Sequence, residues 1–223
     1  MEKVLLVDKP KTWTSFDIVG KVRSNLYKIS GSKIKVGHAG TLDPLATGLL
    51  IVLIGKATKI QDSFMKLDKV YEVEVRLGET STTLDGEGQK TKVSENVPAI
   101  SIVNNVLESF IGDIMQIPPA YSAIKVDGQR AYKLARAGKE VKIEPRKITI
   151  YSITDVIYDY PYLKFTSKVS SGTYIRTLAQ DIGEKLGVGA FMSNLRRTKI
   201  GGYDIKDAVD IENISFDEIV NQE

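Results

Sequence analysis

The sequence predicts an α+β protein with a mixed, mostly antiparallel central sheet flanked by helices. Predicted strands do not alternate regularly with predicted helices, as they would in a parallel α/β sheet. Residues 71–77 alternate cleanly between apolar and charged side chains, which is typical of a half-buried strand. Two more predicted strands, 147–157 and 163–169, follow each other through a short turn at 159–161. The fold class follows from these three observations.

The first quarter of the chain contains two predicted strands around a helix. Val4–Val7 is a short apolar stretch that predicts a buried strand. Ser15 can cap a helix that runs to about Ile29. The helix has its apolar residues at helical spacing: Phe16, Val19, Val22 and Leu26. Leu49–Ile54 is an apolar run between glycines, which predicts a central strand.

The remaining predicted elements have weaker sequence patterns. Residues 80–95 are polar and rich in turn formers, so we expect a loop. An apolar stripe predicts a helix over 100–111, and a short basic helix over 129–137 ends at Gly138. Residues 174–186 predict a helix with Ile175, Leu178, Ile182 and Leu186 on one stripe. Residues 200–203 are expected to close the sheet, and 215–220 to form a last helix.

Composition excludes several classes of protein. The 223 residues contain 42% hydrophobic side chains, enough for a sizeable core, and we see no linker to a second domain. There is no cysteine and only one histidine, so thiol chemistry and a conventional transition-metal site are not expected. The N-terminus lacks a signal-peptide core, and Leu49–Ile54 is too short to cross a bilayer. We therefore expect a cytoplasmic protein without membrane association.

Basic residues gather in one segment although the net charge is only +3. Between Pro119 and Lys147 eight basic residues outnumber three acidic ones, whereas acids dominate from Asp204 to Glu223. The basic residues are Lys125, Arg130, Lys133, Arg136, Lys139, Lys142, Arg146 and Lys147. A basic strip in a near-neutral protein suits a polyanion such as RNA. The alternative is an ordinary solvated helix face.

The loop Gly37–Gly48, GHAGTLDPLATG, is the strongest local signal in the chain. It places the single histidine, His38, close to Asp43, and Pro44 restricts Asp43 to an extended backbone. The carboxylate is thus aimed at a fixed angle. Asp followed by Pro also fits an ordinary helix start, with Asp as the N-cap and Pro at the first helical position.

This loop resembles the catalytic motif of the TruB family, the bacterial synthases that make pseudouridine at position 55 in the T-loop of tRNA. Other segments are similar to further motifs of that family, in the same order along the chain. They are Asp8-Lys9-Pro10 with Thr14-Ser15, GLLIVLIGKATK after the loop, the strand from Tyr71, Lys168–Gly187, and Leu195-Arg196-Arg197. One departure is Thr12, where the family usually has a glycine. The resemblance extends from Lys9 to about Thr198.

The resemblance implies three catalytic residues. It makes Asp43 the nucleophile, Arg176 the arginine partner of that aspartate, and Tyr71 a ring that stacks on the target uracil and assists proton removal from C5. From the residues alone, Arg176 fits a surface ion pair on a helix, and Tyr71 fits a core aromatic.

It also implies binding residues. Tyr174 and Leu195 line the uridine pocket, Lys9 lies beside the active site, and His38 contacts the disrupted T-loop. From the residues alone, Tyr174 fits an aromatic at a helix start, and Leu195 fits a core leucine. Lys9 likewise fits an exposed lysine, and His38 fits an ordinary loop histidine. The segment at about 119–147 corresponds to the family's RNA-gripping segment, which makes Lys125, Arg130, Lys133 and Arg136 candidate RNA-binding residues.

The implied reaction is an isomerisation, so it needs no cofactor and no metal. The carboxylate can attack either C1′ of the ribose or C6 of the base, and the residues leave both routes open. We expect a single catalytic domain over 1–223 without a C-terminal accessory RNA-binding domain. The expected partner is the T-stem-loop of tRNA, with no protein partner required and a monomeric enzyme. The rival hypotheses are a guide-RNA-dependent member of the same superfamily and a non-catalytic RNA-binding module or tRNA chaperone.

Overall fold

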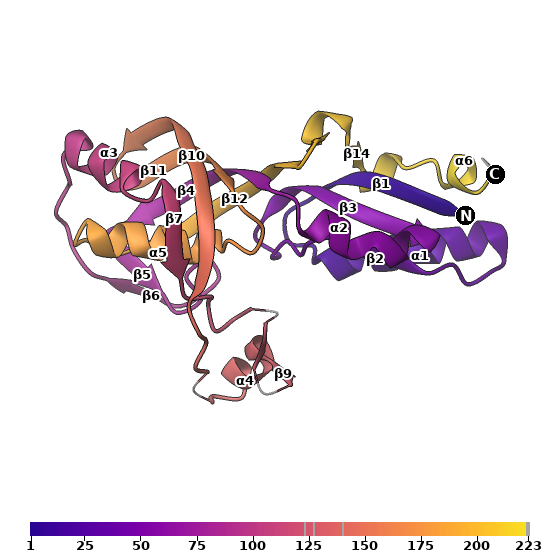
Figure 1. Ribbon diagram of the computed structural model, residues 1–223, viewed down its shortest axis with the longest axis horizontal. Helices are drawn as coiled ribbons and strands as arrows, with labels where there is room; N and C mark the ends of the chain where they lie inside the picture. The colour runs from indigo at the N-terminus through magenta and orange to yellow at the C-terminus, as the bar shows by residue number, and fades with distance from the viewer. Residues whose placement is uncertain (123, 127, 140, 222–223) are drawn as a thin grey trace. The chain divides into compact units, whose positions relative to one another are not determined.

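The computed structural model describes residues 1–122, 124–126, 128–139 and 141–221 (Figure 1). The chain forms two compact units: unit 1 comprises Met1–Glu72 and Leu195–Glu223, and unit 2 comprises Val73–Asn194. It passes between them within strands β4 (Lys69–Leu77) and β12 (Ala190–Ile200). Within the described residues no helix is both long and apolar enough to cross a membrane.

Unit 1 is built on a mixed sheet in the order β14-β1-β3-β12, with β2 added to β3 and β13 to β12. β1 and β2 are antiparallel to β3, whereas β14 is parallel to β1, and β12 is parallel to β3. Its elements are β1 (Glu2–Lys9), α1 (Ser15–Ser30), β2 (Val36–His38), β3 (Thr47–Gly55), η1 (Lys56–Ile60), α2 (Gln61–Met65), β13 (Tyr203–Asp204), η2 (Ile205–Asp207), β14 (Val209–Asp210), η3 (Ile211–Asn213) and α6 (Phe216–Asn221).

Strand β3 explains why the predicted central strand is apolar throughout. Leu50, Val52 and Ile54 pack in one cluster with the apolar face of α1. The alternate residues of β3 pack in a second cluster with Phe64 and Ile200. Both faces of the strand are therefore buried, which removes any polar alternation.

Helix α1 begins where predicted, but Thr14 is its cap and Ser15 is not. The Thr14 hydroxyl accepts a hydrogen bond from the Asp17 amide at 3.1 Å, and the Asp17 carboxylate accepts one from the Thr14 amide at 2.7 Å. This reciprocal capping box satisfies two amides of the first turn. Phe16 is 75% exposed and does not belong to the core, where Ile18 takes its place.

Unit 2 holds strands in the order β4-β11-β10-β7, with β10 antiparallel to both β11 and β7, and two small separate antiparallel hairpins, β5–β6 and β8–β9. Its elements are β5 (Glu79–Ser81), β6 (Lys90–Lys92), α3 (Ile100–Glu108), β7 (Gly112–Gln116), β8 (Lys125–Val126), β9 (Gln129–Arg130), α4 (Ala131–Arg136), β10 (Arg146–Asp159), β11 (Tyr162–Val169) and α5 (Ile175–Lys185). The predicted α+β class with a mixed, mostly antiparallel sheet is confirmed.

Several expectations for secondary structure were wrong. The helix expected over 129–137 begins only at Ala131, because Gln129 and Arg130 form strand β9. The expected loop at 80–95 contains the β5–β6 hairpin. The strand β12 was missed except for its last residue, because an arginine occupies one of its buried positions and hides the alternation. Leu195 and Arg197 both point into the protein, and Arg197 is only 1% exposed.

Candidate active site

The Gly37–Gly48 loop joins β2 to β3 in unit 1. The antiparallel pairing of His38 with Val52 fixes where the loop leaves the sheet. No helix begins at Asp43, so the interpretation of Asp43-Pro44 as a helix start is wrong. Instead, the Ala46 amide donates to the Asp43 carbonyl at 3.0 Å, which closes a β-turn with Pro44 at its second position. The turn presents Asp43, which is half-buried, at a defined corner of the chain.

Thr12, which stands where the family usually has a glycine, helps to hold the turn that carries Asp43. Thr12 has φ of 73°, in the left-handed region where glycine is favoured and a β-branched residue is strained. Its amide donates to the carbonyl of Pro44 at 2.8 Å. The left-handed backbone therefore explains why a glycine suits this position, and the contact ties the turn at Thr12 to the turn that carries Asp43.

Lys9 is fully buried, so its interpretation as an exposed lysine is wrong. Its ammonium group donates to the carbonyls of Pro10 at 2.8 Å and Trp13 at 2.6 Å. These contacts fold the segment after β1 around the lysine. Lys9 thus supports the same turn that contacts Pro44.

His38 is half-buried and makes an edge-to-face contact with Phe16, with ring centroids 5.3 Å apart. Burial lowers the pKa of its imidazole, and the nearby positive charge of Arg197 lowers it further. The ring is therefore neutral at neutral pH, available for stacking or hydrogen bonding but not as a cation. In the described part of the chain its Nδ1 has no hydrogen-bond partner.

Tyr71 and Leu195 lie on β4 and β12 of unit 1, and both are nearly buried, at 8% and 7% exposed. Tyr71 shares the buried face of β4 with Val73 and Val75, as the alternation predicts. This placement agrees with the interpretation of Tyr71 as a core aromatic. Their predicted contacts with uridine stay predictions.

Unit 2 supplies Arg176 and Tyr174 at the start of α5. Gln116 on β7 fixes this start: its side chain accepts from the Tyr174 amide at 2.8 Å and donates to the Tyr174 carbonyl at 3.1 Å. Arg176 is only 7% exposed, so the surface ion-pair interpretation is wrong.

Contacts with Asp85, Thr83 and Tyr121, all described residues of unit 2, hold the Arg176 guanidinium. It lies 3.5 Å from a carboxylate oxygen of Asp85, and it donates to the carbonyls of Thr83 at 3.3 Å and Tyr121 at 2.8 Å. The predicted pairing of Arg176 with Asp43 concerns residues of different units and stays a prediction.

The candidate RNA-binding residues are all exposed. Lys125 and Arg130 lie opposite each other on the β8–β9 hairpin, and Lys133 and Arg136 lie on α4. The Arg136 guanidinium stacks over the Tyr132 ring at 5.7 Å. This placement gives a basic surface on a hairpin and one short helix.

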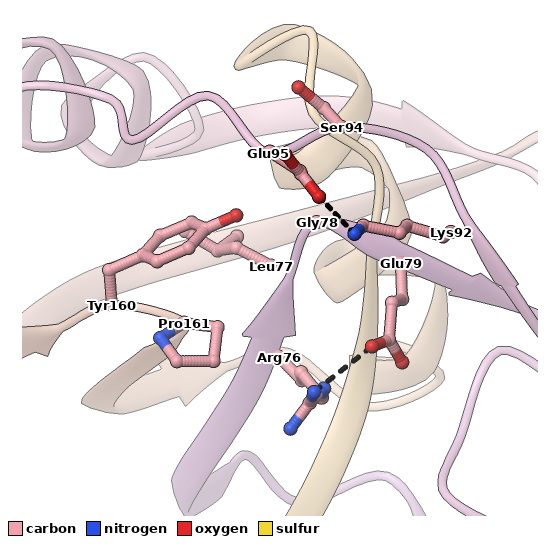
Figure 2. A pocket seen from close by; sticks show the side chains of 9 residues that line it. All are labelled: Arg76, Leu77, Gly78, Glu79, Lys92, Ser94, Glu95, Tyr160 and Pro161. Carbon is pink, nitrogen blue, oxygen red and sulfur yellow. Dashed lines mark hydrogen bonds and ion pairs between the residues drawn. The ribbon is translucent and has the colours of Figure 1, made fainter.

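Unit 2 also contains a hollow of about 240 Å³, whose wall includes residues of β4, β5 and β6 together with Tyr160 and Pro161 (Figure 2). Arg76 and Glu79 form an ion pair of 3.0 Å in its wall, and Lys92 pairs with Glu95. None of the predicted site residues lines it. Its charged side chains pair with each other, and among the described residues the buried Nε of Arg76 has no hydrogen-bond partner.

Two residues near Asp43 were not predicted as site residues: Ser15 and Arg197. Both are 1% exposed, and both bond to the backbone of the Gly37–Gly48 loop. Each lies in a segment similar to a family motif, Thr14-Ser15 and Leu195-Arg196-Arg197. The signal that could have found Arg197 is an arginine at a buried position of a strand, which requires internal hydrogen-bond acceptors.

Solved structures share this fold. A chain of a Cbf5–Nop10–Gar1 complex matches with a TM-score of 0.71 and 30% identity over 96% of this chain and 53% of its own. An H/ACA RNP bound to a substrate RNA containing 2′-deoxyuridine contains a second match, with a TM-score of 0.68 and 28% identity. This chain spans about half the length of those chains, 53% and 52%. The fold is therefore one found in ribonucleoprotein complexes.

Family models and curated relatives are more specific. Residues 26–175 match the model of the TruB family pseudouridylate synthase N-terminal domain, and 176–221 match that of the tRNA pseudouridylate synthase B C-terminal domain. The chain belongs to the TruB family of pseudouridylate synthases.

The relatives named tRNA pseudouridine synthase B include proteins of Clostridium acetobutylicum and Aquifex aeolicus. The first is 47% identical over 96% of this chain and 73% of the relative. The second is 43% identical over 95% of this chain and 73% of the relative. The resemblance drawn from the motifs is confirmed.

Proposed function

We propose that this chain is a tRNA pseudouridine synthase that isomerises the uridine at position 55 of the T-loop. Membership of the TruB family and relatives named tRNA pseudouridine synthase B support the reaction and the class of substrate. The observation that carries the proposal is the Asp43 turn, whose carboxylate-bearing residue is half-buried on a loop bonded to several other segments.

The reaction rearranges bonds without oxidation or reduction. The bond between N1 and C1′ breaks, and a bond between C5 and C1′ forms. C5 loses its proton, and N1 gains one in the product. The ionised carboxylate of Asp43 acts as the nucleophile, at C1′ or at C6. Both routes need the same side chain in a fixed position.

The other residues take roles around that carboxylate. We assign Arg176 to charge pairing with Asp43, and Tyr71 to stacking on the uracil and to removal of the C5 proton. Tyr174 and Leu195 line the uridine pocket, and Lys9 holds the adjacent turn. A buried arginine favours the ionised carboxylate, which the nucleophile requires.

The target base must leave the T-loop before it can reach Asp43. Extrusion of a nucleotide costs a few kcal/mol, which contacts with the unfolded loop can offset. We assign His38 to contact with the opened loop, since a neutral ring can stack on bases. Lys125, Arg130, Lys133 and Arg136 bind phosphates of the same RNA.

We further propose that a single copy of the chain works alone in the cytoplasm as one catalytic domain. A native mass measured with and without a T-stem-loop tests the stoichiometry. A complex with one chain and one RNA supports it, and a dimeric complex contradicts it.

The decisive experiment uses a T-stem-loop transcript carrying tritium at C5 of its uridines. The parent protein releases tritium from one uridine, and Asp43→Asn releases none while still binding the RNA. Moving the label among uridines identifies the position. Release by the amide variant at the parent rate would exclude Asp43 as nucleophile. No release by a folded parent protein from any tRNA would favour the chaperone hypothesis.

A further inference from the structure

Three consecutive residues before Asp43 are bonded to side chains from outside the loop. The backbone of Gly40 and Thr41 is bonded by Arg197, and that of Leu42 by Ser15. All of these residues belong to unit 1. The nucleophile therefore follows a stretch of backbone that has little freedom of its own.

Ser15 makes two hydrogen bonds to one residue. Its hydroxyl accepts from the Leu42 amide at 2.8 Å and donates to the Leu42 carbonyl at 3.1 Å. The hydroxyl is free for this because Thr14 caps the helix instead. Since the capping box holds the first turn of α1, Ser15 is a rigid support for the residue next to Asp43.

Arg197 connects the two sides of the loop. Its Nε donates to the Leu49 carbonyl at 2.8 Å, after the loop, and its Nη2 donates to the Gly40 carbonyl at 3.0 Å, before Asp43. A third contact, from Nη1 to the Thr41 carbonyl, is 3.5 Å long. A planar guanidinium with five donors can hold several carbonyls at once, which an ammonium cannot do in the same geometry.

The charge of Arg197 is costly where it lies. The side chain is 1% exposed, and within the described residues its partners are carbonyl oxygens and no carboxylate. Burial of a charge without an opposite charge costs free energy that neutral acceptors offset only in part. A leucine at this strand position would fill a core without that cost, so the arginine is explained by what it bonds.

Two glycines of the loop lie against Arg197, one against its backbone and one against its side chain. Gly48 has φ of 101°, and a Cβ atom there would lie 2.3 Å from the Arg197 carbonyl oxygen. A Cβ at Gly40 would lie 3.5 Å from Nη1 of Arg197. The close approach at Gly48 is to the backbone of β12, where Arg197 pairs with Gly48, whereas the distance at Gly40 is an ordinary van der Waals contact with the guanidinium.

We propose that Ser15 and Arg197 are positioning residues that hold the backbone of the loop so that the Asp43 carboxylate keeps one direction. The inference rests on the proposed function. Neither side chain touches the reacting atoms. A nucleophile gains rate from being held near its attack geometry, and an error of about 1 Å can cost about 100-fold.

The test compares Ser15→Ala with Ser30→Ala. Ser30 is the last residue of the same helix, and its hydroxyl donates to the Leu26 carbonyl at 2.8 Å, away from the loop. Single-turnover rates are measured with enzyme in excess over a T-stem-loop RNA, together with the Kd of that RNA. Ser15→Ala lowers the rate about 10-fold with an unchanged Kd, and Ser30→Ala leaves both unchanged.

Arg197→Met and Arg197→Lys extend the comparison. We expect the Met variant to lose about 100-fold in rate, and the Lys variant to recover part of it because one ammonium reaches fewer carbonyls. If Arg197→Met does not fold, the rates of Ser15→Ala and Arg197→Lys test the proposal. Parent rates in both of these would overturn the proposal, as would an equal loss in Ser30→Ala.

Amide exchange separates this inference from the proposed function. The Leu42 amide should exchange faster in Ser15→Ala than in the parent or in Ser30→Ala, whether or not the protein isomerises uridine. An unchanged exchange rate of the Leu42 amide would overturn the positioning role of Ser15, even in an active enzyme. A parent protein that produces no pseudouridine overturns the proposed function and leaves the exchange result standing.

Discussion

The Gly37–Gly48 loop and the basic segment at 119–147 are both irregular, yet they are held in opposite ways. In the loop, Thr41 is the one exposed residue, and the backbone is bonded by Ser15, Arg197 and the Thr12 amide. In the basic segment, Pro119, Ser122 and Ala131 are the buried residues among those described from 119 to 147. The charged side chains that the structure describes in that segment are all exposed.

This difference corresponds to two functions, the positioning of a nucleophile and the binding of phosphates. A nucleophile must be held within a fraction of an ångström, so its supports come from several elements and are buried. Phosphate binding depends on charge at medium range and tolerates movement. We therefore expect changes in the loop to act on rate and stability, and changes in the basic segment to act on affinity and salt dependence.

The largest difference between the two regions should appear when one glycine in each is changed to alanine. Gly48→Ala places a methyl group 2.3 Å from the Arg197 carbonyl oxygen, so the backbone must shift. We expect a loss of about 3 kcal/mol in the free energy of unfolding and about 100-fold in turnover. Thermal melts and single-turnover rates measure the two effects.

Gly138→Ala is the matched control in the basic segment. Gly138 also has a positive φ, 70°, but a Cβ there meets nothing within 4 Å. The expected cost is about 1 kcal/mol of local backbone strain, with turnover unchanged. If both substitutions cost the same, the loop is not held more tightly than the segment.

Removing charge from the basic segment should give the next effect. Changing Lys125, Arg130, Lys133 and Arg136 together to Gln should weaken RNA binding on the order of 10- to 100-fold. The slope of log K against log salt should fall by about 3, and the single-turnover rate at saturation should stay at the parent value.

A control with equal charge loss distinguishes contact from net charge. Four exposed basic residues of unit 1 outside the predicted segment, Arg23, Lys28, Lys33 and Lys35, are changed to Gln. An equal loss of affinity in this control would show that the segment has no special role.

A smaller effect is expected at Thr12. Thr12→Gly removes a β-branched residue from a φ of 73° and keeps the amide that donates to Pro44. We expect a gain of about 1 kcal/mol in the free energy of unfolding, after the greater backbone entropy of glycine in the unfolded chain is subtracted. Chemical denaturation measures it. Thr12→Ala should gain less, and an equal gain in both would contradict backbone strain as the cause.

The smallest effect lies in α5, outside both regions. Burial raises the pKa of Asp181 from 3.8 to about 6, with a further contribution from Glu184. The folded state therefore holds this proton up to a higher pH than the unfolded chain does, and the ionised carboxylate destabilises the fold above pH 6.

Asp181→Asn should accordingly stabilise the protein at pH 7 to 8, by about 1 kcal/mol once screening of this partly exposed group is considered. The gain should shrink as the pH falls from about 6 to about 4, because both states then bind the proton. Melting temperatures across this range test it. A gain independent of pH would point to packing instead of charge.

Several elements could be predicted from sequence because their signals are local. The alternation from Tyr71 to Leu77, the helical stripe of α5 and the apolar run of β3 each reflect contact with a core. The loop around Asp43 was recognisable because its residues are unusual together. The strand β12 was not, because the reason for its buried arginine lies in carbonyls about 150 residues away in the sequence.

The sequence by itself determined the fold class, the family and the residue proposed as nucleophile, since strand alternation and short motifs are properties of neighbouring residues. Only the tertiary structure decided that Lys9 and Arg176 are buried, that Thr14 caps α1, and that Ser15 and Arg197 bond the loop. Burial and hydrogen bonding depend on which distant segments meet, and that information appears only when the chain has folded.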